Sequence, residues 1–450
     1  MSMASKRWLH FLLAGGSAAC FLVITFHALG DDDQNQDIVA QNAQNLVQAG
    51  RQTFRYDTFG DEAFWGGTLQ LHQAIEGAAL GGVGPGVSPA TALAVGLKVD
   101  ADALPPSLVE GVQNGSVDLT NPATTLALLK LNAVVGVTGF FNPNGGLQSV
   151  GIQCALCHST VDQSFSTSQI PAGNIGHRLD GWPNRDLNVG AIVNLSPDLS
   201  VPAKLLGVDQ TTVRQVLLSW GPGKFDAELF MDGKAFRPDG TSGSVLIPPA
   251  YGLAGFNLHT WTGWGSVTYW NAFVANLEMH GQGNFFDPRL NNPTQFPVAA
   301  ANGFFNVTST PANDRITPTL AALHVYQLAI PAPKAETNIL NYWSVQDGAT
   351  LFTGKAQCSR CHVPPLYTEP GWNAHAPADV CIDGFQAGRS PAQAYRTAPL
   401  AGLFSHQKGG FYHDGRFATL SDVVDHYNSC MSLQLTDGEK SDLVQYLLTL

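Results

Sequence analysis

Charged side chains are scarce in this sequence, and basic ones are the minority among them. Lys, Arg, Asp and Glu make up 13% of the 450 residues, and the formal net charge is −12. A protein that binds nucleic acid needs a basic patch to neutralise phosphates, so the small number of cations and the sign of the charge exclude that class. An acidic surface instead suits a basic partner such as a small electron-carrier protein.

Cysteine is also scarce, and four of the seven cysteines lie in two C-x-x-C-H motifs, residues 154–158 and 358–362. This pattern is typical of covalent attachment of a c-type haem, because two thiols one helical turn apart match the two vinyl groups of one porphyrin. The histidine that follows directly ligates the iron. A bare C-x-x-C also occurs in redox dithiols and zinc sites, but a histidine fixed after it, twice, favours haem. We predict two covalent haem c groups, held by Cys154, Cys157, His158, Cys358, Cys361 and His362.

The first thirty residues have the pattern of a secretory signal. Lys6 and Arg7 precede a mostly apolar run over residues 8–29, and small residues near Gly30 offer a cleavage site. The apolar run is also long enough for an uncleaved membrane anchor, which stays the alternative. We expect residues 1–30 to be removed and the chain to be periplasmic or extracellular in a bacterium, where haem c is attached.

The remaining cysteines fit an oxidising compartment. Cys20 leaves with the signal, and the haem motifs use four others, so Cys381 and Cys430 remain. In that compartment they form either a disulfide or two free thiols, and the sequence leaves both open.

A weak internal repeat divides the chain. Residues 50–54 (GRQTF) resemble residues 348–352 (GATLF), and the second haem motif follows its copy closely. In the first copy a long stretch intervenes, which we interpret as an insertion at about residues 66–148. Turn-rich sequence separates two predicted helices in it, over residues 90–95 and 124–137.

Each copy of the repeat also ends in a predicted helix. Thr436 and Glu439 have the pattern of a capping box for the last one, and Pro331 stops the first. We expect a mainly α fold with two cytochrome c-type haem domains and long loops, residues 31–334 and 335–450. The residues at helical spacing are Ile316, Leu320, Leu323, Tyr326 and Ile330 in the first domain, and Leu443, Val444, Leu447 and Leu448 in the second.

Four further segments carry a family resemblance. Residues 261–263 and 277–279 read WTG and LEM, and residues 395–400 and 412–420 read YRTAPL and YHDGRFATL. With the haem motifs, these segments resemble the bacterial di-haem cytochrome c peroxidase superfamily, which includes MauG-type enzymes and di-haem rubber oxygenases. The resemblance covers roughly residues 45–65 and 150–450.

The resemblance implies roles at the first, N-terminal haem. His158 would be its proximal ligand and His177 a removable sixth ligand. Glu278 would be the distal acid–base group, which takes a proton from one peroxide oxygen and returns it to the other. Trp261 would lie between the haems and relay electrons.

The resemblance also implies roles around the second haem. His362 would ligate its iron, and Tyr427 occupies the position of the sixth ligand, with His413 and His426 as rivals. Asn188 would bind a calcium ion between the domains, although the family's other residues for that ion are missing here.

Each role at the first haem also has a structural alternative. His177 is compatible with a loop histidine bonded to backbone, and Glu278 with a carboxyl that caps a turn. Trp261 has rivals in Trp264 and Trp270, and tryptophans of this kind more often belong to the core.

The sixth-ligand position influences the predicted function. Well-known peroxidases of the superfamily carry methionine there, whereas Tyr427 is typical of MauG-type members.

Because Glu278 and His177 favour peroxide chemistry, we predict an exported di-haem c-type oxidoreductase that reduces hydrogen peroxide at the N-terminal haem. Electrons would enter through the C-terminal haem. The alternatives are an oxygenase that acts on a hydrophobic substrate with dioxygen, and a non-catalytic electron-transfer cytochrome. The sequence leaves monomer and homodimer open.

Overall fold

Helices dominate the described part of the chain, residues 37–336 and 340–450, in the computed structural model. The strands are short and pair into two-stranded sheets, so the predicted mainly α class is confirmed. The predicted signal, residues 1–30, lies outside the described residues. None of the helices in the described ranges has the length and apolar character that a membrane crossing requires.

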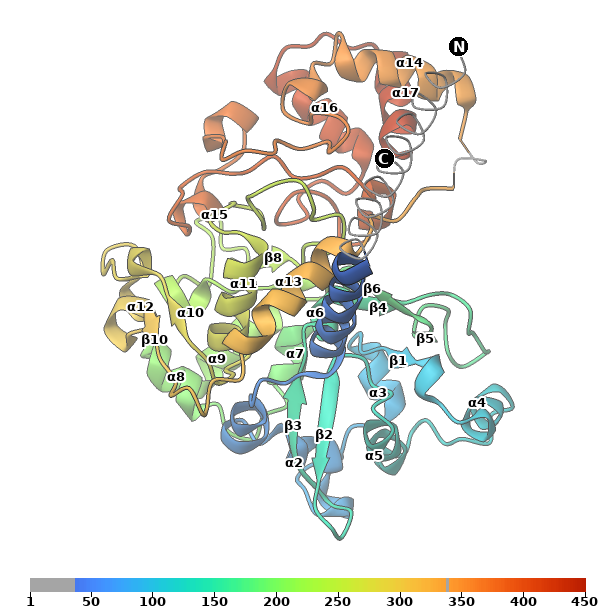
Figure 1. Cartoon of the computed structure of the whole chain (residues 1–450), viewed down its shortest axis with the longest axis vertical. Coiled ribbons are helices and arrows are strands. Elements are labelled where there is room, and N and C mark those ends of the chain that lie inside the picture. The colour runs from blue at the N-terminus through green and yellow to red at the C-terminus, as the bar shows by residue number, and fades with distance from the viewer. Residues whose placement is uncertain (1–36, 337–339) are drawn as a thin grey trace, which may run out of the picture.

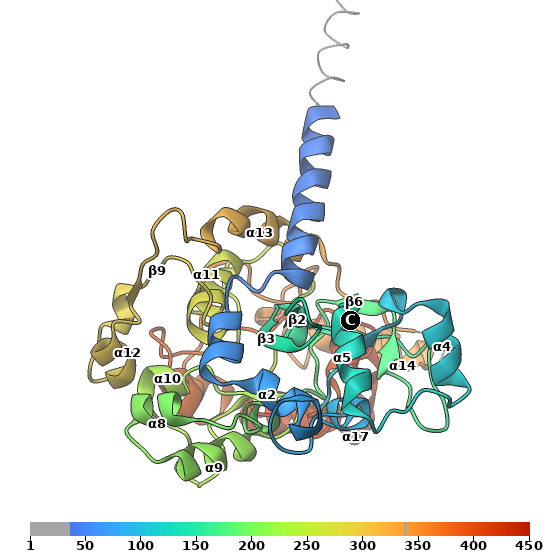
Figure 2. The ribbon, with the colours of Figure 1, turned by 90° about the horizontal axis from the view of Figure 1, so that it is seen from below.

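The first part of the chain carries most of the helices (Figure 1). A long helix over residues 37–56 comes first, and Figure 2 shows it standing out from the body. It is followed by α2 (Leu71–Glu76), α3 (Pro89–Ala94), α4 (Pro106–Gln113), α5 (Pro122–Lys130), α6 (Ala155–His158), α7 (Val189–Val193), α8 (Ser200–Leu206), α9 (Gln210–Trp220), α10 (Leu229–Asp232), α11 (Val267–Phe273), α12 (Pro297–Asn302) and α13 (Leu320–Ala329).

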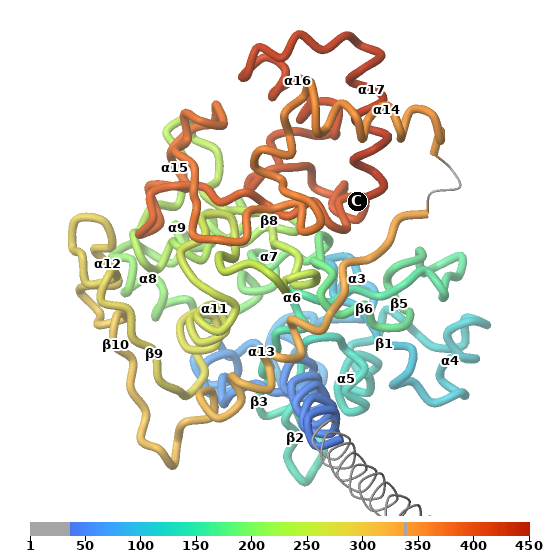
Figure 3. The backbone as a smooth tube through the Cα atoms, turned by 45° about the horizontal axis from the view of Figure 1, so that its top comes forward, coloured from blue at the N-terminus to red at the C-terminus, as the bar shows by residue number. Residues whose placement is uncertain are grey.

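The C-terminal part, residues 340–450, has fewer helices and its own core. They are α14 (Tyr342–Thr353), α15 (Phe385–Gly388), α16 (Leu420–Cys430) and α17 (Asp437–Leu447). Figure 3 shows α14, α16 and α17 together at one end of the molecule. One buried apolar cluster there draws only on residues 352–447.

The sheets are small pairs that hold loops in place. The pair of β1 (Val99–Asp100) and β5 (Ile175–Gly176) is parallel. The antiparallel pairs are β2 (Val137–Phe141) with β3 (Leu147–Ile152), β4 (Ser159–Val161) with β6 (Arg178–Asp180), β7 (Lys224–Phe225) with β8 (Val245–Leu246), and β9 (Phe285–Phe286) with β10 (Asn306–Val307).

The sequence repeat corresponds to a repeated helix crossing. A Cβ atom added at Gly50 would lie 2.0 Å from the carbonyl oxygen of Ala322 on α13. One added at Gly348 would lie 2.1 Å from the carbonyl oxygen of Asp442 on α17. Only glycine allows helix backbones to approach this closely, and this explains why both copies of the repeat begin with it.

The aromatic residue of each copy packs in the same way. Phe54 and Phe352 are both completely buried. The ring of Phe54 meets Tyr326 edge-on at 5.6 Å between centroids, and that of Phe352 meets Tyr446 at 5.3 Å. Edge-to-face pairs at this separation add to the apolar burial, so each crossing is anchored by one such pair.

The predicted closing helices are confirmed, and the insertion is partly corrected. α13 and α17 contain most of the periodic residues, with Ile316, Ile330 and Leu448 just outside their ends, and the Thr436 capping box is present. Within the insertion, α3 matches the predicted helix at 90–95. The second predicted helix, over 124–137, is too long, because α5 ends at Lys130. Asn132 then takes a positive φ of 51° and the chain turns into the β2–β3 hairpin, so pairing between these two neighbouring strands overrides local helix propensity.

Candidate functional site

The first haem motif forms one tight turn that projects its histidine inward. Cys154 precedes α6, and the backbone N–H of His158 donates to the Cys154 carbonyl at 3.1 Å. The imidazole Nδ1 lies 3.1 Å from the Pro248 carbonyl oxygen. A carbonyl there accepts the Nδ1 proton and leaves Nε2 free as a metal ligand. Burial lowers the pKa of His158 to about 4, so the ring is the neutral form that binds iron.

The second motif repeats this geometry on a different local structure. The backbone N–H of His362 donates to the Cys358 carbonyl at 2.9 Å. Its Nδ1 lies 3.1 Å from the Tyr367 carbonyl oxygen, and burial lowers its pKa. Both motifs therefore present a neutral, oriented imidazole beside two thiols, the donor set that covalent haem attachment requires.

Each motif opens into its own cavity. The first has a volume of about 320 Å³ and contains Cys154, Cys157 and His158 in its wall. The second has a volume of about 230 Å³ and contains Cys358, Cys361 and His362. The wall of the first is largely apolar, and the insertion supplies much of it. Its contributors include Leu71, Ile75, Val87, Leu93, Leu128 and Leu129.

Two arginines, the buried Arg185 and the half-buried Arg396, indicate that the cavities suit an anionic ligand. Arg396 lines both cavities and Arg185 lines the second. Nη1 of Arg396, and Nε and Nη1 of Arg185, have no hydrogen-bond partner among the described residues. Burial lowers the pKa to about 9 for Arg396 and to about 10 for Arg185. A buried guanidinium is costly unless an anion pairs with it, and haem propionates are such anions, so the residues present fit haem.

Glu278 faces the first cavity. It ends a π-helical turn over Val274–Glu278 and lies in the cavity wall. Trp65 fixes this segment, because its Nε1–H donates to the carbonyl of the next residue, Met279, at 2.9 Å. Burial, and then the charges of Glu228 and Asp226, raise the pKa of Glu278 to about 8. A carboxyl with a pKa near neutrality suits proton transfer in both directions.

His177 lies away from the first cavity. Its side chain is 58% exposed, and Nδ1 lies 2.8 Å from an oxygen of Asp102 in the insertion. That carboxylate raises the pKa of His177 and favours the charged imidazolium, which cannot bind a metal. This arrangement does not support the predicted role of His177 as a distal ligand.

Trp261 lies in the wall shared by the two cavities. It lines both of them, together with Pro248, Pro249, Thr260 and Arg396. Its indole Nε1–H donates to the Leu246 carbonyl at 2.9 Å, which fixes the ring. The rivals differ, because Trp264 lines neither cavity and Trp270 lines only the first. An electron relay between the two sites has to border both cavities, and Trp261 does so.

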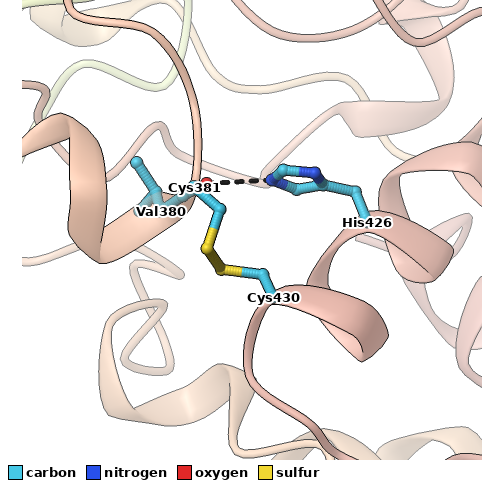
Figure 4. Close-up of a disulfide and its surroundings, with 4 residues drawn as sticks. All are labelled: Val380, Cys381, His426 and Cys430. Atoms are coloured by element: carbon cyan, nitrogen blue, oxygen red, sulfur yellow. Dashed lines mark hydrogen bonds between the residues drawn. A yellow bond between two sulfur atoms is a disulfide. The ribbon is translucent and has the colours of Figure 1, made fainter.

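The candidate sixth ligands of the second haem are separated by the structure. Tyr427 and His413 line the second cavity, and so does Met431. His426 does not, because its Nε2 lies 2.9 Å from the Val380 carbonyl oxygen (Figure 4). Burial raises the pKa of Tyr427. Of the two adjacent residues on α16, only the tyrosine faces the second cavity.

A disulfide joins Cys381 to Cys430, which settles one alternative left open by the sequence. Figure 4 shows it linking the loop after Val380 to the end of α16, beside the His426 contact. The bond and the hydrogen bond hold α16 against this loop. They therefore restrict the helix that carries Tyr427.

The region around Asn188 is built for a different cation. The Asn188 side chain accepts from the N–H of Ala191 at 3.0 Å and so caps α7. Two residues earlier, Asp186 receives the ammonium groups of Lys98, at 2.8 Å, and of Lys408 from the C-terminal part. Lysine therefore already supplies positive charge between the two parts here, and we do not propose a calcium ion.

Comparisons with known proteins give one sequence match. No family model matches the chain. The methylamine utilization protein MauG of Methylorubrum extorquens is 29% identical over 119 residues, which cover 23% of this chain and 33% of that protein. The chain resembles MauG-type proteins. This sequence match confirms the resemblance that the motifs indicated. The matched segment spans about a third of the relative's length.

Solved structures of related description are more remote. A MauG-like protein associated with microbial copper homeostasis is 19% identical with a TM-score of 0.31, and the match covers 48% of this chain and 77% of that one. Hydrazine synthase of Kuenenia stuttgartiensis is 15% identical with a TM-score of 0.30, over 50% of this chain and 86% of that one. The diheme peroxidase BthA of Burkholderia thailandensis is 18% identical with a TM-score of 0.30, over 51% of this chain and 78% of that one. TM-scores this low do not establish a shared fold. The function of this chain is therefore inferred from its own residues.

Sequence reasoning missed several charged residues at this site that are fully or partly buried. Arg396 lies within the YRTAPL segment, but no role was assigned to it. Asp226, Glu228 and Asp232 lie in an otherwise apolar stretch and are all buried. Three acidic residues within seven positions of an apolar segment were the available signal, because buried carboxylates require partners.

Proposed function

We propose that this protein is an exported di-haem c-type oxidoreductase that reduces hydrogen peroxide at the first haem, with electrons entering through the second. One observation carries the proposal. Glu278 places a carboxyl with a pKa near neutrality in the wall of the cavity that also contains Cys157 and His158. A titratable group with a strongly shifted pKa, in a cleft with a metal-binding histidine, favours catalysis over simple electron storage.

The haem would supply an iron that binds peroxide and exchanges electrons. The residues of the chain supply the proton chemistry. The Glu278 carboxylate would accept a proton from one peroxide oxygen and return it to the other, which would leave as water. His158 stays neutral and oriented because its Nδ1 proton is held by the Pro248 carbonyl. The apolar wall excludes bulk water from the reacting bond.

The second site would receive electrons and pass them through the shared wall. Trp261 is the proposed relay, because it lines both cavities. The formal net charge of −12 favours a basic small electron-carrier protein as the reductant. We assign one haem domain to residues 31–334 and the other to residues 335–450, after removal of residues 1–30.

An EPR spectrum of the purified protein, fully oxidised and then half-reduced, tests the proposal. We expect a high-spin, five-coordinate signal from one haem in at least one of the two states, and a change of that signal on addition of peroxide. Two low-spin signals that persist in both states, with no response to peroxide, would contradict the proposal and indicate a non-catalytic electron-transfer cytochrome.

A second candidate function follows from the apolar wall of the first cavity. The insertion supplies many of its apolar side chains, and such a wall suits a hydrophobic substrate. In that case the protein would be a dioxygen-dependent oxygenase. Stable binding of dioxygen by the reduced first haem, without peroxide turnover, would favour this candidate over the peroxidase.

A further inference from the structure

A second carboxyl group lies in the wall of the first cavity. Glu228 is 6% exposed and lines the same cavity as Glu278. Its Oε1 accepts a hydrogen bond from Nε2 of Gln386 at 2.9 Å. Its Oε2 is buried and has no hydrogen-bond partner among the described residues. A buried carboxylate oxygen is costly without a donor, so this oxygen is suited to carry a proton.

The surroundings of Glu228 contain more acid than base. Arg389 is completely buried and contacts two acids, Asp226 at 2.9 Å and Asp232 at 2.9 Å. Glu228 also feels the charges of Arg389 and Asp232. Three buried carboxyls therefore share one guanidinium, and Glu278 adds a fourth carboxyl nearby. Since unpaired buried charges neutralise themselves, this group of residues holds protons at neutral pH.

The pKa directions agree with this count. Burial raises the pKa of Asp226 to about 7, although Arg389 opposes the shift. Burial also raises the pKa of Glu228. The oxygen Oδ2 of Asp226 has no hydrogen-bond partner in the described ranges. The two acids in the wall of the first cavity, Glu228 and Glu278, therefore both have a raised pKa.

Peroxide reduction requires such a store. The overall reaction is H2O2 + 2 e⁻ + 2 H⁺ → 2 H2O. Cleavage of the O–O bond releases the first water with no net proton uptake, because Glu278 returns the proton that it took. Formation of the second water consumes two electrons and two protons from elsewhere. The largely apolar wall of the first cavity offers few other donors for them.

We infer that Glu228 delivers protons to the first cavity during the electron-consuming half of peroxide reduction. It donates one proton to the cavity with each electron and is reprotonated from solvent after each transfer, so two transfers supply both protons of the second water, while Gln386 holds its position. This inference rests on the proposed function and deepens it, because it separates two carboxyl roles. Glu278 serves bond cleavage, and Glu228 serves the uptake of protons that follows.

Stopped-flow spectroscopy of the holoprotein separates the two halves. Mixing oxidised protein with hydrogen peroxide reports bond cleavage, and later addition of ascorbate as the electron source reports the return of the spectrum. We expect Glu228→Gln to leave the first phase unchanged and to slow the second about tenfold or more, with a matching loss in kcat and little change in KM. Glu278→Gln should slow the first phase instead.

Two further variants decide between proton delivery and a structural role. Glu228→Asp keeps the carboxyl and should recover much of the rate of the second phase. Glu110→Gln removes an exposed carboxyl from α4 and should behave as wild type. A Glu228→Gln protein as fast as wild type in the second phase overturns the inference, and so do equally slow Gln and Asp variants. The proposed function itself fails only if the wild type shows no first phase.

Discussion

The two haem motifs share one local geometry but face cavities of opposite character. In both, a neutral histidine is oriented by a backbone carbonyl. The first cavity adds acids, Glu278 and Glu228, to a largely apolar wall. The second adds groups able to ligate iron, among them Tyr427 and His413. This difference underlies our proposal that the motif would hold the haem in the same way at both sites, whereas the rest of each wall would decide between reacting with an oxidant and passing electrons.

Removal of the covalent attachment points tests this division most strongly. Cys154→Ala with Cys157→Ala should lower the haem content from two to one per chain and abolish the reaction with peroxide. Cys358→Ala with Cys361→Ala should also leave one haem, but oxidised protein should still react with peroxide while turnover stops. Mass spectrometry and stopped-flow absorbance measure both. Loss of the peroxide reaction only in the second pair would reverse our assignment of the two sites.

Glu278→Gln should have the next largest effect, a loss of about 10² to 10⁴ in the rate of the first phase. The carboxylate form accepts the proton, and the pKa is about 8. The wild-type rate should therefore rise as pH increases through about 8, and the variant should lack this rise. Stopped-flow rates between pH 6 and 10 measure it. An unchanged rate and pH profile in the variant would leave Glu278 as a structural residue.

Substitution of Tyr427 should affect the second site alone. Tyr427→Phe removes the oxygen ligand that we propose for the second haem, so the midpoint potential of this haem should rise, by about 0.1 V or more. His426→Gln is the matched control, since His426 faces the Val380 carbonyl instead of the cavity. Redox titration followed by absorbance measures both variants. A shift of the midpoint potential in the His426 variant, with none in the Tyr427 variant, would indicate that His426 and not Tyr427 is the ligand.

Loss of the disulfide should destabilise the C-terminal part and leave the first site unchanged. The bond closes a loop with a sequence separation of 49 residues. Cys381→Ser with Cys430→Ser should lower the free energy of unfolding by about 4 kcal/mol in the chain-entropy estimate. Denaturant unfolding, followed at the absorbance of each haem, measures it. Equal destabilisation at both haems would show that the two parts unfold together.

Chelation should have the smallest effect. Because Lys98 and Lys408 hold Asp186, we expect EDTA to change neither haem spectra nor turnover. Lys408→Ala should lower the free energy of unfolding by less than about 1 kcal/mol, as is usual for the loss of an exposed ion pair. Thermal unfolding with and without added calcium measures both. If activity were lost on chelation and restored by calcium, the result would support the predicted calcium ion with Asn188 as a ligand.

The sequence predicted well what is encoded over short distances. The haem motifs are contiguous, and the closing helices follow from apolar spacing and a local cap. His177 shows the limit, because its partner Asp102 lies 75 residues away in the insertion. The pairing of Asp232 with Arg389 spans 157 residues and leaves no local pattern. Such contacts depend on how distant loops pack, which periodicity does not encode.

The buried pairing of Arg389 with the acids behind the first cavity bears on how such chains evolve. Gln386 and Arg389 come from the C-terminal part, yet they complete a site whose haem motif lies in the N-terminal part. A recombination event that exchanged one part alone would leave Asp226, Glu228 and Asp232 buried without the guanidinium of Arg389. The two parts are therefore not interchangeable modules, and they would have to be inherited as a pair.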